Sequence, residues 1–407
     1  MLIIRTFFVF CFLSGSASAL TLSEALEFSL SNMESLKIAD HQIEQQEFVK
    51  KKARGALLPT INGVGSYTKI DPPRAAGNNP FLLTRQYSWA MRLTQPLLRG
   101  GSIAALGVAD EQRNLALLQR ETTIQNLSRT VIQAYAQYSL SFRDQQILNE
   151  SLKINQTRFN EMKRRYQVGK IRKGEFLEAD AQLDRSKVAF ENASKQLQVS
   201  KKNLEFYIGR EISSEPPMIS LGTPSLVKAE QLKRSEILVA EKEQEIAKKM
   251  IEIQKGDHYP RLDLITNYYF DRTGILSTSN WDIGLQVSVP LFQGGVVYSS
   301  VKEAQEKWMA SKLNENLKKR QVENENKILE SQISQNLSQL DYAKQVLKKS
   351  QSAFEATKTD DKFGLISQLE VLQSLNNYVQ AQRELSLLEH ETFVLLKTHQ
   401  LYAGEKI

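Results

Sequence analysis

The sequence predicts a mainly α-helical protein with a membrane β-barrel part, built from two copies of one structural unit. Three observations lead to this fold class. Long stretches lack proline and carry apolar residues every three or four positions, as helices in a bundle do. Short stretches such as Trp281 to Val289 alternate apolar and polar residues, which is typical of strands with one apolar face. Similar landmarks recur in the same order in both halves of the 407 residues.

The chain begins with a segment that has the features of a signal peptide. Arg5 precedes an apolar run over 6–13, and small residues follow at 17–19. The run is too short to span a bilayer as a helix, so we expect residues 1–19 to be removed on export. The only cysteine, Cys11, lies in this segment. The mature chain would then hold no thiol, which suits an oxidising exported compartment.

The charge balance argues against nucleic-acid binding. The chain has 53 Lys and Arg against 46 Asp and Glu, and both signs are mixed along the predicted helices. A solvated surface explains this pattern better than a basic stripe does. No later stretch reaches the roughly 20 apolar residues that a transmembrane helix needs.

The two halves share landmarks at a nearly constant spacing. "QPLLRGG" (95–101) resembles "VPLFQGG" (289–295), and each follows an alternating stretch. The paired positions are Pro96 and Pro290, 194 residues apart, Gly169 and Gly364, 195 apart, Gly209 and Gly404, 195 apart, and Pro59 and Pro260, 201 apart. We therefore predict a first repeat over 20–210, a linker over 211–230 and a second repeat over 231–407. Each repeat reads helix, strand, loop, strand, very long helix, tight turn, helix.

Each repeat contains one β-hairpin. The expected hairpins cover 60–96, with strands at about 60–70 and 87–96, and 260–290, with strands at about 261–271 and 281–290. Strands of about ten residues fit a tilted crossing of a bilayer. The alternative is an ordinary soluble hairpin, but the neighbouring polar helices offer it no core. Aromatic residues near the loop-side strand ends fit an interfacial girdle: Tyr87, Trp89, Tyr268, Tyr269 and Trp281.

The helices that follow the hairpins are unusually long. Between 102 and 166 there is no proline, and Gly107 is the only glycine; a helix of this length is on the order of 95 Å. The stretch over 296–359 repeats this length. Apolar residues stepping by three and four predict a coiled-coil seam: Ile124, Leu127, Val131, Tyr135, Tyr138 and Phe142. Such helices pack side by side as a bundle or a tube.

Four amphipathic strands per chain imply an assembly. Four strands cannot close a barrel, and a lipid-exposed sheet edge is not tolerated. About eight strands make the smallest familiar closed membrane barrel. Several chains must therefore share one barrel in a ring-shaped homo-oligomer. The strand count alone leaves the number of chains open.

These features together resemble the TolC-type outer-membrane efflux proteins. The resemblance rests on "LTLSEALEFSLSN" (20–32), "LLP" (57–59), the two "PLxxGG" stretches, "RYQVGKIRKGEFLEADAQ" (165–182) and "KFGLISQLEVLQSLNNY" (362–378), and it covers essentially the whole mature chain. It implies a homotrimer whose twelve strands form one barrel in the outer membrane of a Gram-negative-type cell. It also implies a helical barrel that crosses the periplasm and closes at its tip. There it would meet a periplasmic membrane-fusion adaptor and an inner-membrane transporter.

The same resemblance assigns roles at two periplasmic tips, over 166–175 and 360–370. The residues expected to dock the adaptor are Val168, Gly169, Lys170, Phe363, Gly364 and Leu365. Glu175 and Glu370 are expected to line the closed tip as a cation-selective ring, or alternatively to stabilise helix N-termini. The second tip departs from the family pattern, with Leu365 and Ile366 in place of a gate arginine and Gln373 in place of a second acid. Apolar contacts, or Asp360 and Asp361, would then close the gate.

The expected function is an outer-membrane exit duct of a tripartite efflux or type I secretion system. It would conduct a drug, a metal or a polypeptide passively. A soluble periplasmic coiled-coil adaptor or scaffold is the alternative; the duplicated amphipathic strands and the absence of a lipoyl-like segment argue against it. We expect no enzyme and no cofactor. No phosphate-binding loop or nucleophile elbow occurs in the sequence. The four histidines are scattered, without the spacing of metal ligands: His41, His258, His390 and His399.

Overall fold

The computed structural model describes residues 20–71, 85–216, 219, 221, 234–274, 276–363 and 365–405. The expected signal peptide, most of the expected linker and Gly364 lie outside these ranges. The described chain forms two compact units. One, the sheet unit, draws on 37–122 and 234–322, and the other, the helical unit, draws on the remaining residues.

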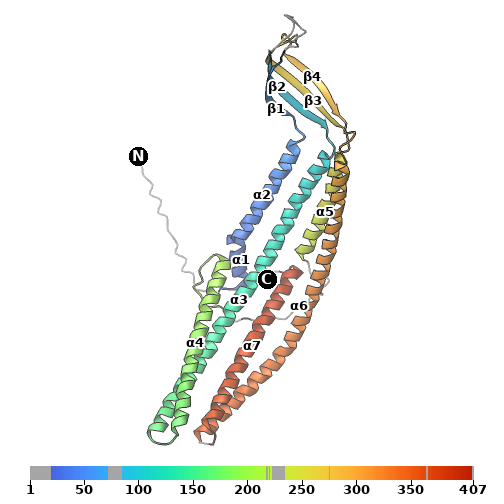
Figure 1. Ribbon diagram of the computed structural model, residues 1–407. Helices are drawn as coiled ribbons and strands as arrows, with labels where there is room; N and C mark the ends of the chain where they lie inside the picture. Colours follow the sequence, from blue (N-terminus) through green and yellow to red (C-terminus); the bar gives the residue numbers. More distant parts are fainter. Residues whose placement is uncertain are drawn as a thin grey trace, which may run out of the picture. The chain divides into compact units, whose positions relative to one another are not determined.

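The sheet unit contains an antiparallel sheet of four strands in the order β1-β2-β3-β4 (Figure 1). The strands are β1 (Thr60–Lys69), β2 (Arg85–Leu98), β3 (Arg261–Arg272) and β4 (Trp281–Ser288). Each begins and ends within two residues of the range expected from the sequence. Pairing of β2 with β3 joins the two hairpins into one sheet. Register shifts at Trp89/Ala90 and Pro96/Leu98 interrupt this ladder.

Helices α2 (Glu34–Gly55) and α5 (Ser235–Gly256) flank the first part of the long helix α3 (Ser102–Gln167) in the sheet unit. Ion pairs connect α2 to α3, with Lys50 Nζ 2.6 Å from Asp110 Oδ1 and Arg113 Nε 2.7 Å from Glu47 Oε2. The long helix α6 (Val296–Lys362) packs next to α5, where Lys319 pairs with Glu241 at 2.8 Å. Within this unit the helices therefore follow the order α2, α3, α5, α6.

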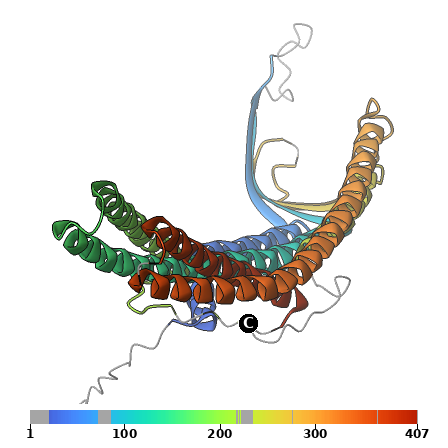
Figure 2. The same ribbon diagram turned by 90° about the horizontal axis from the view of Figure 1, so that it is seen from below.

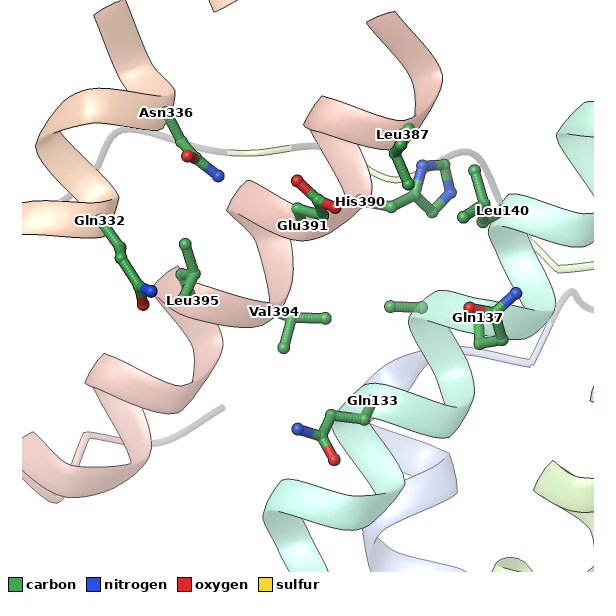
Figure 3. Close-up of a pocket in the computed structure, with 11 residues that line it drawn as sticks. Gln133, Gln137, Leu140, Gln332, Asn336, Leu387, His390, Glu391, Val394 and Leu395 are labelled. Carbon is green, nitrogen blue, oxygen red and sulfur yellow. The ribbon is translucent and has the colours of Figure 1, made fainter. Parts of the chain in front are cut away.

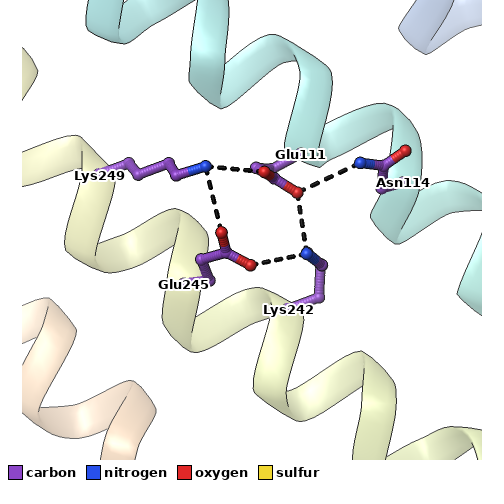
Figure 4. A network of polar contacts seen from close by, with 5 residues as sticks. All are labelled: Glu111, Asn114, Lys242, Glu245 and Lys249. Atoms are coloured by element: carbon purple, nitrogen blue, oxygen red, sulfur yellow. Dashed lines mark hydrogen bonds and ion pairs between the residues drawn. The ribbon is translucent and has the colours of Figure 1, made fainter.

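A polar network links α3 to α5 (Figure 4). Glu111 accepts hydrogen bonds from Lys242 Nζ at 2.9 Å and Lys249 Nζ at 2.7 Å, and both lysines also bind Glu245. The two lysines hold the pKa of Glu111 well below its ordinary 4.5, at about 2, against the opposing effect of burial. The carboxylate therefore stays charged, and the network ties the two helices together.

The helix ends next to the sheet approach each other so closely that only glycine fits. A Cβ atom on Gly100 would lie 1.8 Å from the carbonyl oxygen of Gly256, and one on Gly256 would lie 2.2 Å from the backbone nitrogen of Gly101. Gly101 also has a φ of 79°, a conformation that favours glycine. The glycines of "QPLLRGG" thus let the start of α3 pack against the end of α5.

The helical unit contains α1 (Leu22–Asn32), the second part of α3, α4 (Lys173–Ile208), the second part of α6 and α7 (Gln368–Ala403) (Figures 1 and 2). Contacts join neighbouring helices in the order α4, α3, α7, α6. Gln145 of α3 bonds Ser194 of α4 at 3.0 Å, Arg383 of α7 bonds Asp144 of α3 at 3.2 Å, and Thr357 of α6 bonds Ser374 of α7 at 3.3 Å.

The main core of the helical unit lies where α1 packs against α3, α4 and α7. The predicted seam supplies much of it, since Leu127, Val131, Tyr135 and Tyr138 are buried in this cluster with Ile124 beside them. Burial raises the pKa of the Tyr135 phenol to about 12, and its hydroxyl donates to the Leu20 carbonyl at 3.1 Å. The prediction of a mainly helical protein is confirmed, and the predicted strands form one small antiparallel sheet.

Candidate functional site

One face of the four-stranded sheet is apolar and exposed. Cross-strand partners in an antiparallel pair point to the same side, so the register assigns each residue to a face. The apolar face carries Ile61, Tyr67, Tyr87, Trp89, Met91, Tyr268, Trp281, Ile283, Leu285 and Val287, all of them exposed. Trp89 and Trp281 are 63% and 64% exposed, although tryptophan is normally well buried. A patch of this kind marks a surface that another apolar phase or molecule covers.

The expected girdle residues Tyr87, Trp89, Tyr268 and Trp281 all lie on this face, at the loop-side ends of the strands. Tyr268 stands directly opposite Trp281 in the β3–β4 ladder. Tyr269 does not belong to the set. Adjacent residues of a strand point to opposite faces, so Tyr269 lies on the other side of the sheet from Tyr268.

The opposite face of the sheet is polar and internally bonded. Arg92 Nε donates to Asn267 Oδ1 at 2.8 Å, and Asn267 Nδ2 donates to Asp282 Oδ1 at 2.8 Å. The Arg272 guanidinium lies 4.1 Å from the centroid of the Tyr269 ring. Strands β2, β3 and β4 are thus linked by side chains on this face. The sheet therefore separates an apolar surface from a hydrophilic one.

Both edges of the sheet are open among the described strands. β1 pairs only with β2, and β4 pairs only with β3. Because the four strands alternate in direction, β1 and β4 run antiparallel to each other. The edge β4 of one copy can therefore continue the antiparallel pattern at the edge β1 of another copy.

The first expected tip is the turn between α3 and α4. Gly169 has a φ of 72°, and the backbone N–H of Lys170 donates to the carbonyl of Arg165 at 2.8 Å, which is the pattern of a Schellman helix end. Val168 beside it is exposed. Five exposed basic side chains surround the turn and form no ion pair in the described structure: Lys163, Arg164, Lys170, Arg172 and Lys173.

The second expected tip is the turn between α6 and α7. Its backbone closes in the same way, with the N–H of Leu365 donating to the carbonyl of Asp360 at 3.1 Å. Phe363 and Leu365 are 75% and 72% exposed, so this tip presents two large apolar side chains to its surroundings. Gly364, the remaining expected docking residue, lies outside the described residues.

The two expected gate glutamates both lie in the first turn of a helix. Glu175 is half-buried in α4, and its N–H donates to the Arg172 carbonyl at 3.1 Å. Glu370 of α7 is exposed and makes two hydrogen bonds with the N-cap residue Ser367. The backbone N–H of Glu370 donates to the Ser367 hydroxyl at 3.4 Å, and that hydroxyl donates to the Glu370 carboxylate at 3.0 Å. Glu370 therefore takes part in the N-terminal cap of α7.

The expected gate acids Asp360 and Asp361 differ sharply in their surroundings. Asp360 is exposed and uses its backbone carbonyl in the turn. The Asp361 side chain is only 9% exposed and lies 3.6 Å from both Arg158 and Arg165 of α3. Gln368 completes the group, because its amide donates to Asp361 at 3.3 Å and accepts from Arg158 at 2.6 Å. We refer to Arg158, Arg165, Asp361 and Gln368 as the tip clasp.

The tip clasp connects three helices, because α3, α6 and α7 all contribute to it. Burial lowers the pKa of the Arg158 guanidinium, and the Asp361 charge opposes that effect. Sequence reasoning missed Arg158 because it lies outside the expected tip. One feature of the sequence could have indicated a role for Arg158. It is a charged residue at a position that follows Ser151 and Asn155 and precedes Met162 at steps of three and four, and these three residues are buried.

A recess of about 520 Å³ lies between α3, α6 and α7 of the helical unit (Figure 3). Gln133 and Gln137 line it two residues after the core residues Val131 and Tyr135, so they point away from the α1 side. The other polar lining residues are Gln332, Asn336, His390 and Glu391. This face of the helical unit is therefore rich in uncharged polar groups.

His390 and Glu391 are the two residues lining this recess whose side chains can act as an acid or a base. The His390 Nε2 lies 3.2 Å from the Ser139 hydroxyl, and its Nδ1 lies 2.6 Å from the Ser386 carbonyl oxygen. Burial lowers the pKa of His390, and Ser139 is itself buried. Among the described residues, no carboxylate orients the imidazole ring. The contact between His390 and Ser139 joins α7 to α3.

Two further properties of the described residues concern membranes and metals. None of the described helices has a stretch both long and apolar enough to cross a membrane. No cluster of three or more metal-ligating His, Cys, Asp or Glu side chains occurs within the described part of the chain.

Comparisons with known proteins identify the family. The family model "Outer membrane efflux protein" matches residues 25–210 and 226–393. The outer membrane protein TolC of Vibrio cholerae is 24% identical over 356 residues, which cover 82% of this chain and 79% of that protein. The alkaline protease secretion protein AprF of Pseudomonas aeruginosa is 21% identical over 415 residues, covering 96% and 86%.

The fold has close counterparts among solved structures. The CmeC outer membrane channel of Campylobacter jejuni superposes with a TM-score of 0.80 at 16% identity, covering 95% of this chain and 86% of that one. At this identity the superposition shows a shared fold. Together with the family match over most of the sequence, it leads to one conclusion. The chain belongs to the outer membrane efflux protein family and is a TolC-type protein of the outer membrane.

Proposed function

We propose that the protein is the outer-membrane exit duct of a tripartite efflux or type I secretion system, through which cargo passes passively to the exterior. The observation that carries this proposal is the sheet with one exposed apolar face, one bonded polar face and two open edges. A lipid phase covers the apolar face, and water fills the space on the polar side. The four girdle residues then lie at the outer boundary of the lipid.

The open edges support a shared barrel. Three chains joined from β4 to β1 give one closed barrel of twelve antiparallel strands, which removes every edge from lipid. Each chain then consists of two repeats, 20–210 and 231–407, joined by the linker 211–230. The outer helices of the helical unit support the same assembly, because both expose apolar residues at helical spacing: Leu177, Val188 and Val199 on α4, and Ile328, Tyr342 and Val346 on α6.

The long helices form the wall of a helical barrel in the periplasm. The face of the helical unit that carries the recess, and that α1 does not cover, lines the lumen of this barrel. Its uncharged amide side chains favour a hydrated wall that does not bind cargo tightly. The helix turns are its periplasmic tips. There Val168, Gly169, Lys170, Phe363, Gly364 and Leu365 meet a membrane-fusion adaptor, and an inner-membrane transporter supplies the energy.

The tips also hold the gate. The tip clasp keeps α3, α6 and α7 together, which supports a closed state that rests on Asp361 instead of an arginine of the second tip. Glu175 and Glu370, repeated by symmetry, give the tip a negative ring that favours cations. Asp360 is exposed at the second tip and adds to that charge.

Single-channel recording in a planar bilayer tests the proposal. Purified protein should give a small, cation-selective conductance, and the double variant Glu175→Ala, Glu370→Ala should lose that selectivity. A wild-type pore whose selectivity the variant leaves unchanged would keep the channel and reduce both glutamates to helix capping. A protein that stays soluble without detergent and never conducts would refute the channel in favour of a periplasmic scaffold.

A further inference from the structure

The end of α2 next to the sheet carries an unpaired cluster of positive charge. Four of the five residues from 50 to 54 are Lys or Arg. Lys50 binds Asp110 of α3, but Lys51, Lys52 and Arg54 are exposed and form no ion pair in the described structure. We call these three side chains the basic collar.

The acids at this border of the sheet unit do not neutralise the basic collar. Glu47, one turn earlier on α2, pairs with Arg113. Asp257 and Asp263, near the start of β3, pair with Arg261 and Arg99. The collar therefore presents three net positive charges to its surroundings.

Exposed apolar residues lie at the same end of the strands as the basic collar. Leu58 lies between α2 and β1, Ile61 lies at the start of β1, and Leu97 lies next to the last residue of β2. Leu291 and Phe292, just after β4, are 92% and 89% exposed, far more than packing against the protein would leave. The apolar surface of the sheet thus extends to the level at which the helices begin. At that level the exposed basic side chains of the collar follow it.

Lys51 shows how the two kinds of surface meet. Its ammonium lies 4.8 Å from the centroid of the exposed Phe48 ring, on the helix side of the border. Long basic side chains at such a border keep their stems on apolar surface and extend their charged ends into the head-group layer.

We propose that the basic collar binds the phosphate groups of anionic phospholipids in the membrane leaflet that faces the helices. This inference rests on the proposed function, because it requires the apolar face of the sheet to lie in lipid. Clusters of Lys and Arg beside a membrane segment attract anionic lipid through both charge and hydrogen bonding. The collar then fixes the depth of the barrel from the periplasmic side, opposite the aromatic girdle.

A helix C-terminus also favours basic residues, so stability alone cannot test the collar. The readout is lipid selectivity of the full-length protein in phosphatidylcholine vesicles, measured by electron spin resonance with spin-labelled phosphatidylglycerol and spin-labelled phosphatidylcholine. The two probes differ in head-group charge, and both report lipid immobilised at the protein surface. The variants are Lys51→Gln, Lys52→Gln, Arg54→Gln and the matched control Lys344→Gln, Lys348→Gln, Lys349→Gln, which removes the same charge from α6 in the helical unit.

The wild type should immobilise phosphatidylglycerol in preference to phosphatidylcholine by about threefold or more at low salt. The collar variant should lose this preference while still immobilising both lipids, and the control variant should keep it. Equal immobilisation of the two probes by the wild type, or a preference that survives in the collar variant, would overturn the inference and leave the membrane channel in place. Absence of any immobilised lipid would instead refute the membrane contact of the sheet and the proposed function with it.

Discussion

Individual glycines decide how the sheet unit is assembled. The start of α3 and the end of α5 meet at Gly100, Gly101 and Gly256, where an added Cβ atom would overlap backbone atoms that cannot move aside. Replacing Gly100 or Gly256 by alanine should therefore lower the free energy of unfolding by about 1–3 kcal/mol or more. Thermal unfolding of the purified protein measures the effect.

Gly107 provides the control for this prediction. It lies inside α3 with no atom within 4 Å of its would-be Cβ, so Gly107→Ala should be neutral or stabilising by about 0.5–1 kcal/mol. Equal unfolding temperatures for Gly100→Ala, Gly107→Ala and the wild type would show that the glycine contact does not form.

At the scale of elements, the tip clasp is the contact that holds the ends of α3, α6 and α7 together. Asp361→Asn leaves the half-buried guanidinium groups of Arg158 and Arg165 without their carboxylate, which should cost on the order of 1–3 kcal/mol. We expect the tip to loosen and the mean single-channel conductance to rise.

Asp360→Asn is the matched control, because it removes the same charge one residue away from an exposed side chain. It should leave the size of the conductance close to that of the wild type. If both variants behaved alike, the conductance would respond to net charge at the tip, and the clasp would have no role in closure.

The elements themselves could largely be predicted from sequence, because their signals are local. Alternation of apolar residues located β2 and β4, the repeated landmarks around Pro59 and Pro260 located β1 and β3, and the absence of proline located α3 and α6. The contacts between elements could not be predicted in the same way. Arg158 meets Asp361 across a gap of about two hundred positions in the chain, and no local pattern encodes which helix faces which. The pairing of β2 with β3 and the approach of Gly100 to Gly256 belong to the same class.

At the scale of the whole molecule, a single chain leaves the sheet incomplete. Its polar face is bonded across three strands, yet its apolar face and both edges lack partners among the described residues. Lipid can cover the apolar face, but only strands can satisfy the backbone groups of β1 and β4. The proposed function therefore requires that neighbouring copies join β4 to β1 in a closed ring.

Disulfide crosslinking between these edges tests that requirement most directly. Cys11 is the only natural cysteine, and it lies in the expected signal peptide, so the mature chain offers a background without thiols. Cysteine pairs on the polar face, such as Asn62→Cys with Gly284→Cys and Val64→Cys with Gln286→Cys, then scan the contact between the two edges. Oxidation in cells should convert at least one pair into covalent dimers and closed trimers, while either cysteine alone should give none. If several such pairs gave only monomers in outer membranes that contain the folded protein, the shared barrel would be contradicted.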